Sequence, residues 1–381
     1  MPVFSCGGMR YQMSWSDDER GTIDERNQRN LEATIRRALE LGVNHIETAR
    51  GYGTSEFQLG KILPQLPRDE IIVQTKVAPQ ASSDGFLAEF EASMDALRLD
   101  HVDLLALHGV NDAETLEWSL GAGGCLEAAQ RLRRDGRVRH IGFSTHGPTS
   151  TIIEAIESGG FDYVNLHWYF VNDFNWPAIE RAQARDLGVF IISPSDKGGR
   201  LYQPPEKLRR LCRPLTPMQF NDLYCLARPQ VHTLSLGAAC PADFDEHVAA
   251  LEQYERAAEA VAEVESRIHA EMERVLGADW VANWWRGLPE PDAVPGRVAL
   301  RDILRLWTFA KSLDMVEFAR ERYNILGNAG HWFPGRNAGE FDERAIRRCL
   351  DGHPLRERIP QVLREAHQLL AGEPRQRESQ R

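Results

Sequence analysis

Four polar residues of types that transfer protons stand at the ends of three consecutive apolar segments. Glu47 ends the apolar run in VNHIETA, and Tyr52 follows in the glycine-flanked turn RGYG. Lys76 lies near the end of IIVQTKV, and His108 ends VDLLALH. A phenol has a pKa of about 10, and a neighbouring ammonium group lowers that pKa by stabilising the phenolate. A carboxylate keeps that ammonium charged and an imidazole can donate to a carbonyl oxygen, so this set predicts protonation of a carbonyl.

Each of these residues also has a structural explanation when it is taken alone. Lys76 could extend from a strand end to water, and His108 could be a hydrogen-bonded core histidine. Glu47 could cap the next helix, and Tyr52 could simply pack its ring. Four polar groups at three successive strand ends would all need partners if they were buried. They satisfy one another if Lys76 pairs with Glu47 and Tyr52 lies near both Lys76 and His108, so their joint occurrence favours a site.

Eight short β-rich segments must position these residues, and helix-like segments separate them. The strand-like segments are residues 2–8, 43–49, 71–77, 102–108, 140–145, 163–168, 189–194 and 232–237. Near-continuous apolar strands with crossover helices between them indicate a parallel sheet. Eight such units predict a (β/α)8 TIM barrel, in which functional residues gather at the C-terminal ends of the strands. The alternative is a doubly wound open sheet, but no GxGxxG turn follows any strand.

After residue 240 the pattern changes. Residues 241–278 predict one or two long charged helices, and residues 279–381 carry five of the nine tryptophans with no strand-like segment. We therefore predict two domains, a barrel over residues 1–253 and a C-terminal all-helical extension over residues 254–381.

Composition narrows the classes of function and the compartment. The net charge of −11 argues against nucleic acid as the main partner. No apolar run approaches the ~18–20 residues that span a bilayer, so we expect no membrane partner, and we see no signal peptide at the N-terminus. The six cysteines are scattered without a CxxC pair, which predicts no zinc site and suits a cytoplasmic protein.

The motifs ETARGYGTSE, TKV, LLALHG, IGFSTHG, ISPSDKGG and LGAACPADFDEH together carry a family resemblance. Over roughly residues 2–253 the chain resembles the aldo-keto reductases, which are NADPH-dependent enzymes on a (β/α)8 barrel. The resemblance implies that Glu47, Tyr52, Lys76 and His108 match the family's catalytic Asp, Tyr, Lys and His. Glutamate in place of aspartate is a departure that lengthens the side chain and keeps the charge.

The resemblance also implies a site for a nicotinamide cofactor. Ser144 and Asn165 would contact its carboxamide, and the turn SPSDKGG would wrap its pyrophosphate. The turn residues concerned are Ser193, Pro194, Lys197, Gly198 and Gly199. This stretch could otherwise be a flexible glycine turn.

The adenosine end of the cofactor would lie after the eighth strand. Gly237 and Cys240 would face the adenosine phosphate, and Glu246 and His247 the adenine. The family often has an arginine near here, where this chain has Ala238, Ala239 and Cys240. The resemblance implies NADPH as the cofactor, and the missing arginine weakens that preference and makes NADH possible.

The C-terminal region resembles the extension of a bacterial subfamily whose members often hold ferredoxin-type cysteine clusters. Here the comparable segment has only Cys349 nearby, so we expect no iron–sulfur cluster. Its aromatic residues could cover the barrel mouth or form the core of the extension itself. These residues are Trp284, Trp285, Trp332 and Phe333.

Three hypotheses for function follow. The first is an oxidoreductase that reduces a small aldehyde or ketone, with Tyr52 as the acid. The second is a cofactor-binding sensor or regulatory subunit with little turnover, which the glutamate substitution motivates. The third is a structural assembly protein that binds no nicotinamide cofactor. The complete set of four residue types favours the first, because a sensor needs no proton donor.

Overall fold

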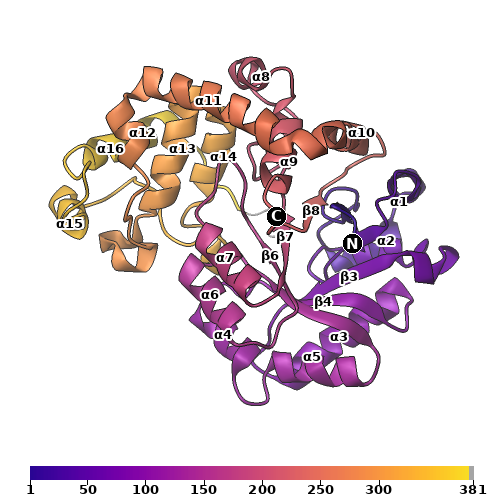
Figure 1. Cartoon of the computed structure of the whole chain (residues 1–381). Helices are drawn as coiled ribbons and strands as arrows, with labels where there is room; N and C mark the ends of the chain where they lie inside the picture. Colours follow the sequence, from indigo (N-terminus) through magenta and orange to yellow (C-terminus); the bar gives the residue numbers. More distant parts are fainter. Residues whose placement is uncertain (377–381) are drawn as a thin grey trace. The chain divides into compact units, whose positions relative to one another are not determined.

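The computed structural model describes residues 1–376 and divides into two compact units (Figure 1). The first unit comprises Met1–Gly198 and Asn221–Ala257. The second comprises Gly199–Phe220 and the described part of Ala258–Arg377. The expected domain boundary after residue 253 stays a prediction.

The first unit is built on a closed barrel of parallel strands. The strands are β1 (Phe4–Gly7), β2 (His45–Glu47), β3 (Ile72–Val77), β4 (Val102–His108), β5 (Val138–Ser144), β6 (Tyr163–Leu166), β7 (Gly188–Ile192) and β8 (Thr233–Leu236). Each strand pairs in parallel with the next, and β1 pairs with β8 to close the sheet. The predicted (β/α)8 TIM barrel is confirmed, and the open-sheet alternative is excluded by that closure.

Helices connect the strands of the barrel and follow its last strand. They are α1 (Glu25–Glu40), α2 (Ser55–Leu59), α3 (Ser83–Leu97), α4 (Ala113–Leu120), α5 (Cys125–Arg134), α6 (Thr149–Glu157), α7 (Trp176–Ala184), α9 (Pro217–Leu226) and α10 (Asp243–Ala250). Short 3-10 helices are η1 (Asp17–Thr22), η2 (Leu63–Gln65), η3 (Arg68–Glu70) and η4 (Leu251–Arg256). The sequence pattern missed α4, a short helix that begins with a capping box between Asp112 and Thr115.

Helix α1 illustrates why the sequence folds in this way. The side chain of Asp24 caps its first turn by accepting from the backbone N–H of Arg26. Leu31, Ile35 and Ala38 recur at helical spacing and are all fully buried. The apolar face of the helix is thereby removed from water while its charged face stays exposed.

Strand register places the polar residues of the strand ends in rows. His108 lies opposite Ser144, and Ser144 lies opposite Asn165 on the next strand. Glu47 lies opposite Gln74. Because side chains alternate along a strand, residues two apart on β2 or on β3 face the same side of the sheet.

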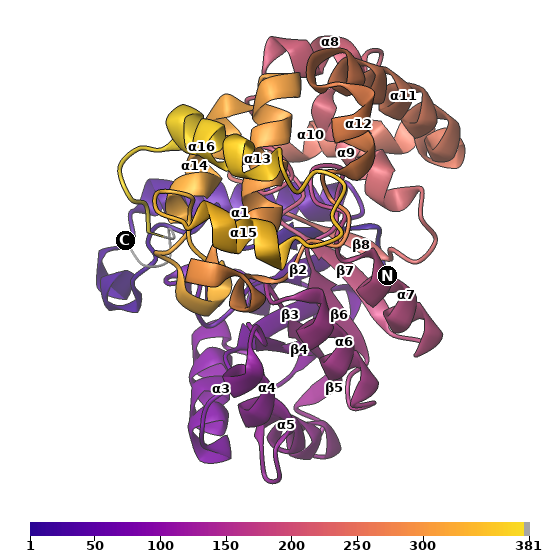
Figure 2. The same ribbon diagram turned by 90° about the vertical axis from the view of Figure 1, so that its left-hand side faces the viewer.

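The second unit is helical. Its helices are α8 (Glu206–Cys212), α11 (Ala257–Leu276), α12 (Ala278–Asn283), α13 (Leu300–Leu313), α14 (Val316–Ile325), α15 (Glu343–Cys349) and α16 (Ile359–Leu370), with the 3-10 helices η5 (Pro291–Ala293), η6 (Pro295–Arg297) and η7 (Gly330–Trp332). Helices α13, α14 and α16 pack together, as Figure 2 shows. Within residues 258–376 no strand forms, apart from an isolated bridge between Val298 and Arg336. The prediction of an all-helical C-terminal extension is confirmed.

Tryptophans form part of the core of this helical unit. The ring of Trp280 packs edge-on against Trp307, with centroids 5.0 Å apart, and its Nε1 donates to Thr308. Trp284 is buried, whereas Trp285 is 48% exposed. Trp280 and Trp307, which the sequence pattern did not single out, thus join Trp284 in the core of this unit.

None of the helices within residues 1–376 combines the length and apolar character that crossing a membrane requires.

Candidate active site

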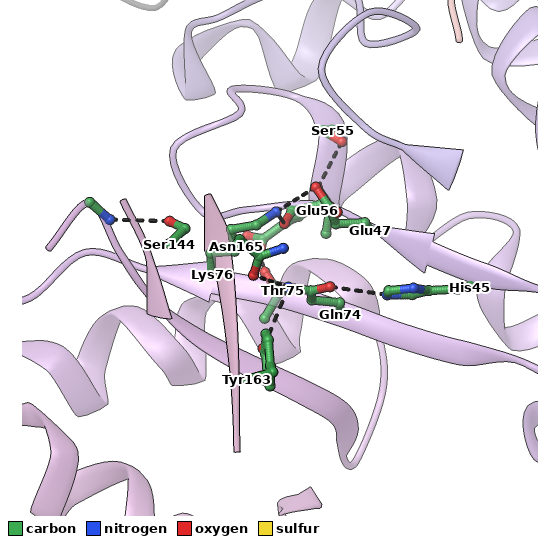
Figure 3. Close-up of polar contacts among 12 residues, drawn as sticks. His45, Glu47, Ser55, Glu56, Gln74, Thr75, Lys76, Ser144, Tyr163 and Asn165 are labelled. Atoms are coloured by element: carbon green, nitrogen blue, oxygen red, sulfur yellow. Dashed lines mark hydrogen bonds and ion pairs between the residues drawn. The ribbon is translucent and has the colours of Figure 1, made fainter. Parts of the chain in front are cut away.

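A buried ion pair stands at the C-terminal ends of β2 and β3. Lys76 Nζ lies 2.7 Å from Glu47 Oε1 and donates to the backbone oxygen of Thr48 at 3.0 Å (Figure 3). The side chains of Lys76 and Glu47 are 1% and 3% exposed, so the charges are held away from water. The longer glutamate side chain therefore makes direct contact with the lysine.

Burial opposes ionisation of both groups, but their mutual attraction outweighs it. Attraction to Lys76 and the hydrogen bond from it hold the pKa of Glu47 below its usual range. Attraction to Glu47, and secondarily to Tyr52, raises the pKa of Lys76 above its usual range. Both groups are therefore charged at neutral pH, and Lys76 is a fixed cation.

Tyr52 lies over this cation on the turn after β2. Lys76 Nζ is 5.1 Å from the centroid of the Tyr52 ring. His108, at the end of β4, packs edge-on against the same ring, with centroids 5.6 Å apart and an interplanar angle of 83°. Trp15 contacts Tyr52 in a similar edge-on manner at 6.0 Å. Tyr52 and His108 are half-buried, in contrast to the ion pair beneath them.

Glycine shapes the turn that carries Tyr52. Gly53 has a φ of +53°, and a Cβ there would lie 2.1 Å from the backbone oxygen of Ser14. Only glycine fits both the backbone conformation and the close approach. The turn is further held by the N–H of Tyr52, which donates to Ala49 O at 3.0 Å.

The two residues assigned to a carboxamide contact lie side by side on β5 and β6. Ser144 is buried, and its Oγ accepts from the N–H of Gly109 at 3.2 Å. Asn165 is fully buried, and its Oδ1 accepts from Gln74 Nε2 at 3.0 Å. Its Nδ2 has no hydrogen-bond partner within the described residues. An orphaned donor in a buried position is what an absent polar ligand would leave.

The loop after β7, which carries the residues expected to wrap a pyrophosphate, is tightly packed. Ser193 adopts a positive φ of +52°, and its carbonyl accepts from the N–H of Lys197 at 3.1 Å. Pro194 O accepts from Asn221 Nδ2, and a Cβ on Gly198 would lie 1.7 Å from that same oxygen. Gly199, with a φ of +132°, belongs to the second unit.

Lys197 lies at one end of a series of polar contacts that runs through two histidines to a tyrosine. Its Nζ lies 3.4 Å from His146 Nδ1, and His146 Nδ1 lies 3.0 Å from His167 Nε2. His167 Nδ1 is in turn 3.1 Å from the hydroxyl of Tyr169. Because His146 and His167 follow the ends of β5 and β6, these contacts hold the half-buried Lys197 near those strand ends.

An arginine from a distant part of the sequence reaches the loop after β8. Arg10 Nη1 donates to Gly237 O at 2.7 Å and lies 3.3 Å from Asp243 Oδ2. Cys240 Sγ contacts the same carboxylate, at 3.5 Å from Oδ1. The local sequence around Cys240 lacks an arginine, and only the fold brings Arg10 there.

His247 lies within a buried chain of three polar side chains. Its Nδ1 is 2.5 Å from Asp222 Oδ2 and its Nε2 is 3.5 Å from Ser195 Oγ. Burial raises the pKa of Asp222, against the opposing attraction of His247. Glu246 is half-buried beside it. These contacts tie α10 to the loop after β7.

Sequence reasoning missed Gln74, His45 and Asp222. Gln74 precedes Lys76 by two residues and His45 precedes Glu47 by two, so each shares a strand face with a candidate residue. That two-residue spacing could have identified both residues from the sequence. For Asp222 the sequence offered no such signal, because its partner His247 lies 25 residues away.

Among residues 1–376 no group of three or more His, Cys, Asp or Glu side chains is arranged to hold a metal ion.

Comparison with known proteins adds independent information. The model of the Aldo/keto reductase family matches residues 5–266. L-galactose dehydrogenase from Arabidopsis thaliana is 27% identical over 280 residues, which are 65% of this chain and 86% of that protein. An aldo-keto reductase from Mycobacterium sp. (strain KMS) is 36% identical over 188 residues, which are 46% of this chain and 62% of that protein.

Two solved structures share the fold. A holo-form aldo-keto reductase from Bacillus halodurans has a TM-score of 0.57 and 22% identity, covering 70% of this chain and 91% of its own. An aldo-keto reductase from Klebsiella pneumoniae in complex with NADPH has a TM-score of 0.54 and 19% identity, covering 68% and 90%.

Proposed function

The chain belongs to the aldo/keto reductase family, and from this premise we propose that it reduces an aldehyde or ketone to an alcohol with NADPH, or NADH, as hydride donor. The observation that carries the proposal is the buried ion pair of Lys76 and Glu47 beneath the ring of Tyr52. A buried, paired charge is costly to build for stability alone, whereas a fixed cation beside a phenol serves proton transfer.

The side chains take different parts in this reaction. Tyr52 gives its phenolic proton to the carbonyl oxygen as negative charge develops there. The ammonium of Lys76 stabilises the phenolate that remains, and Glu47 holds Lys76 charged and in place. His108, edge-on to Tyr52, donates a hydrogen bond that orients the carbonyl oxygen.

The residues present fit a nicotinamide cofactor. The orphaned Nδ2 of Asn165 supplies a donor for a carboxamide, and the close turn at Gly198 with Lys197 suits a pyrophosphate. Such a cofactor, when bound, supplies the hydride that no side chain can provide. The NADPH complex of the Klebsiella pneumoniae protein supports this assignment.

The test is Tyr52→Phe, measured in two ways. We expect saturable NADPH binding, followed by tryptophan fluorescence, to match that of wild type, because the ring and its packing are kept. Turnover of a panel of aldehydes and ketones should fall by about 10²-fold or more, the usual size of a general-acid contribution. Turnover equal to wild type would show that Tyr52 is not the acid.

The same measurements address the alternative of a cofactor-binding sensor, which the glutamate at position 47 motivates. A sensor would bind NADPH or NADH but turn over no carbonyl in the panel, with or without Tyr52.

A further inference from the structure

A row of hydrogen bonds crosses the interior of the barrel from β2 through β3 to β6. His45 Nε2 lies 3.0 Å from Gln74 Oε1, and Gln74 Nε2 donates to Asn165 Oδ1 at 3.0 Å (Figure 3). All three side chains are fully buried, at 0% exposure. Gln74 Nε2 also lies 3.4 Å from the hydroxyl of Tyr163. Water cannot substitute for any of these partners without entering the core.

Both ends of the row carry an atom without a partner. His45 Nδ1 and Asn165 Nδ2 are buried and make no hydrogen bond to the described residues. The row therefore ends in a donor at the end of β6, opposite Ser144 in the register.

The hydrogen bonds of the row can be oriented from donor to acceptor in only two ways, because each side-chain amide has an NH2 group that donates and an oxygen that accepts. In the direction of the structure, His45 donates from Nε2, Gln74 donates onward, and Asn165 is left with its Nδ2–H. In the reverse direction both amides are flipped, and Asn165 is left with its Oδ1 acceptor.

The protonation state of His45 favours the hydrogen-bond direction seen in the structure. Burial lowers the pKa of His45 to about 4, so the ring is neutral and carries a single N–H. In the observed direction that N–H is satisfied by Gln74, and the orphaned Nδ1 is a bare acceptor. In the reverse direction the N–H would sit on Nδ1, buried and unpartnered, and an orphaned buried N–H is the rarer and costlier defect.

We propose that His45 and Gln74 are positioning residues that fix Asn165 as a hydrogen-bond donor toward the ligand, selecting a carbonyl oxygen on the nicotinamide side chain. The proposal rests on the proposed function, since it requires a nicotinamide cofactor. It adds that the polarity of this contact is set on the opposite side of the barrel, by residues that do not touch the cofactor.

The test compares two ligands that differ only at this contact. NADP⁺ carries a carboxamide, and its 3-acetylpyridine analogue keeps the carbonyl oxygen but has a methyl group in place of the NH2. Protein fluorescence gives the Kd of each without any turnover. The quantity measured is the ratio of the Kd of the analogue to that of NADP⁺.

Two variants should raise this ratio. In Asn165→Asp the side chain keeps its shape and presents only acceptors, so NADP⁺ can turn its NH2 toward it and the analogue cannot. In Gln74→Glu the carboxylate accepts from Asn165 Nδ2 and turns Asn165 Oδ1 to the ligand. We expect a rise of about tenfold in each, the effect of one hydrogen bond made or lost in a buried site. His45→Phe, which removes the donor at the start of the row, should raise the ratio by about threefold.

Thr233→Val is the matched control, because Thr233 is a fully buried barrel residue outside the row, and its hydroxyl has no hydrogen-bond partner among the described residues. The ratio for this control should equal that of wild type.

The outcome for Asn165→Asp decides the proposal. If this variant binds NADP⁺ with an unchanged ratio, Asn165 already presents its oxygen in wild type and the proposal is overturned, even if Gln74→Glu does not fold. An unchanged ratio in His45→Phe removes His45 from the row. Wild type that binds neither NADP⁺ nor NAD⁺ overturns the proposed function as well, which the variants alone cannot do.

Discussion

Lys76 Nζ and Glu47 Oε1 are 2.7 Å apart in a site from which water is excluded. Each charge is tolerable only because of the other, since isolated ions in a protein interior are strongly destabilising. Their separate substitution and their joint substitution should therefore have very different effects.

Lys76→Met should lower the free energy of unfolding by about 3–5 kcal/mol, because it leaves the Glu47 carboxylate buried without a partner. The double variant Lys76→Met with Glu47→Gln should recover most of that stability, since no charge is left in the site. Carbonyl turnover should be lost in both. Urea unfolding of wild type, the two single variants and the double variant gives the coupling. Additive losses in the double variant would contradict a tightly coupled pair.

The same pair predicts a broad plateau of stability with pH. The pKa of Glu47 is lowered in the folded state, so its contribution is present above its unfolded pKa of about 4.3 and is lost as pH falls through the folded value. The pKa of Lys76 is raised, so its contribution is present below about 10.4 and is lost as pH rises through the folded value. Unfolding measured across pH should show both losses in wild type and neither in the uncharged double variant.

His45 predicts an additional loss of stability in mild acid. Its pKa is about 4 in the folded protein because of burial, whereas the unfolded chain takes up the proton near pH 6.5. The unfolded state thus binds more protons between these values, and stability falls as pH drops through that window, by about 3 kcal/mol in total. His45→Gln should remove this slope between pH 6.5 and 4. A slope that persists in the variant would assign it to another group.

The position of Arg10 leads to a prediction about the preference for NADPH over NADH. Its guanidinium lies at Gly237, on the loop that the family resemblance assigns to the adenosine phosphate. If Arg10 binds the extra phosphate of NADPH, Arg10→Gln should weaken NADPH binding by about tenfold and leave NADH nearly unchanged, because a charge-assisted hydrogen bond is lost. Arg37→Gln is a matched control, since Arg37 pairs with Asp245 on the same helix α10. Equal loss for both cofactors would exclude a role for Arg10 in phosphate recognition.

The fold was predictable because the alternation of apolar strand and amphipathic helix is repeated along the sequence. Eight apolar strands with amphipathic connections leave few alternatives, and residues at strand ends then converge by topology. Lys76 and Glu47 could be paired for that reason. Contacts such as Arg10 with Gly237, or Asp222 with His247, join loops and helices far apart in sequence, and no local pattern encodes them. Helix α4 was missed because it is short and its start depends on a side-chain cap.

The turn that carries Tyr52 gives a final prediction, in which two glycines of like conformation are compared. Gly53 and Gly42 both have positive φ, +53° and +80°, but only at Gly53 would a Cβ meet another atom within 4 Å, at 2.1 Å from Ser14 O. Gly42→Ala should cost about 1–2 kcal/mol of stability, the strain of a left-handed alanine, and leave turnover intact. Gly53→Ala carries the same strain and must also displace the backbone at Ser14, which moves Tyr52 relative to Lys76. We expect a larger loss of stability together with a loss of carbonyl turnover, measured by urea unfolding and NADPH oxidation. Equal behaviour of the two variants would mean that the turn adapts without moving Tyr52.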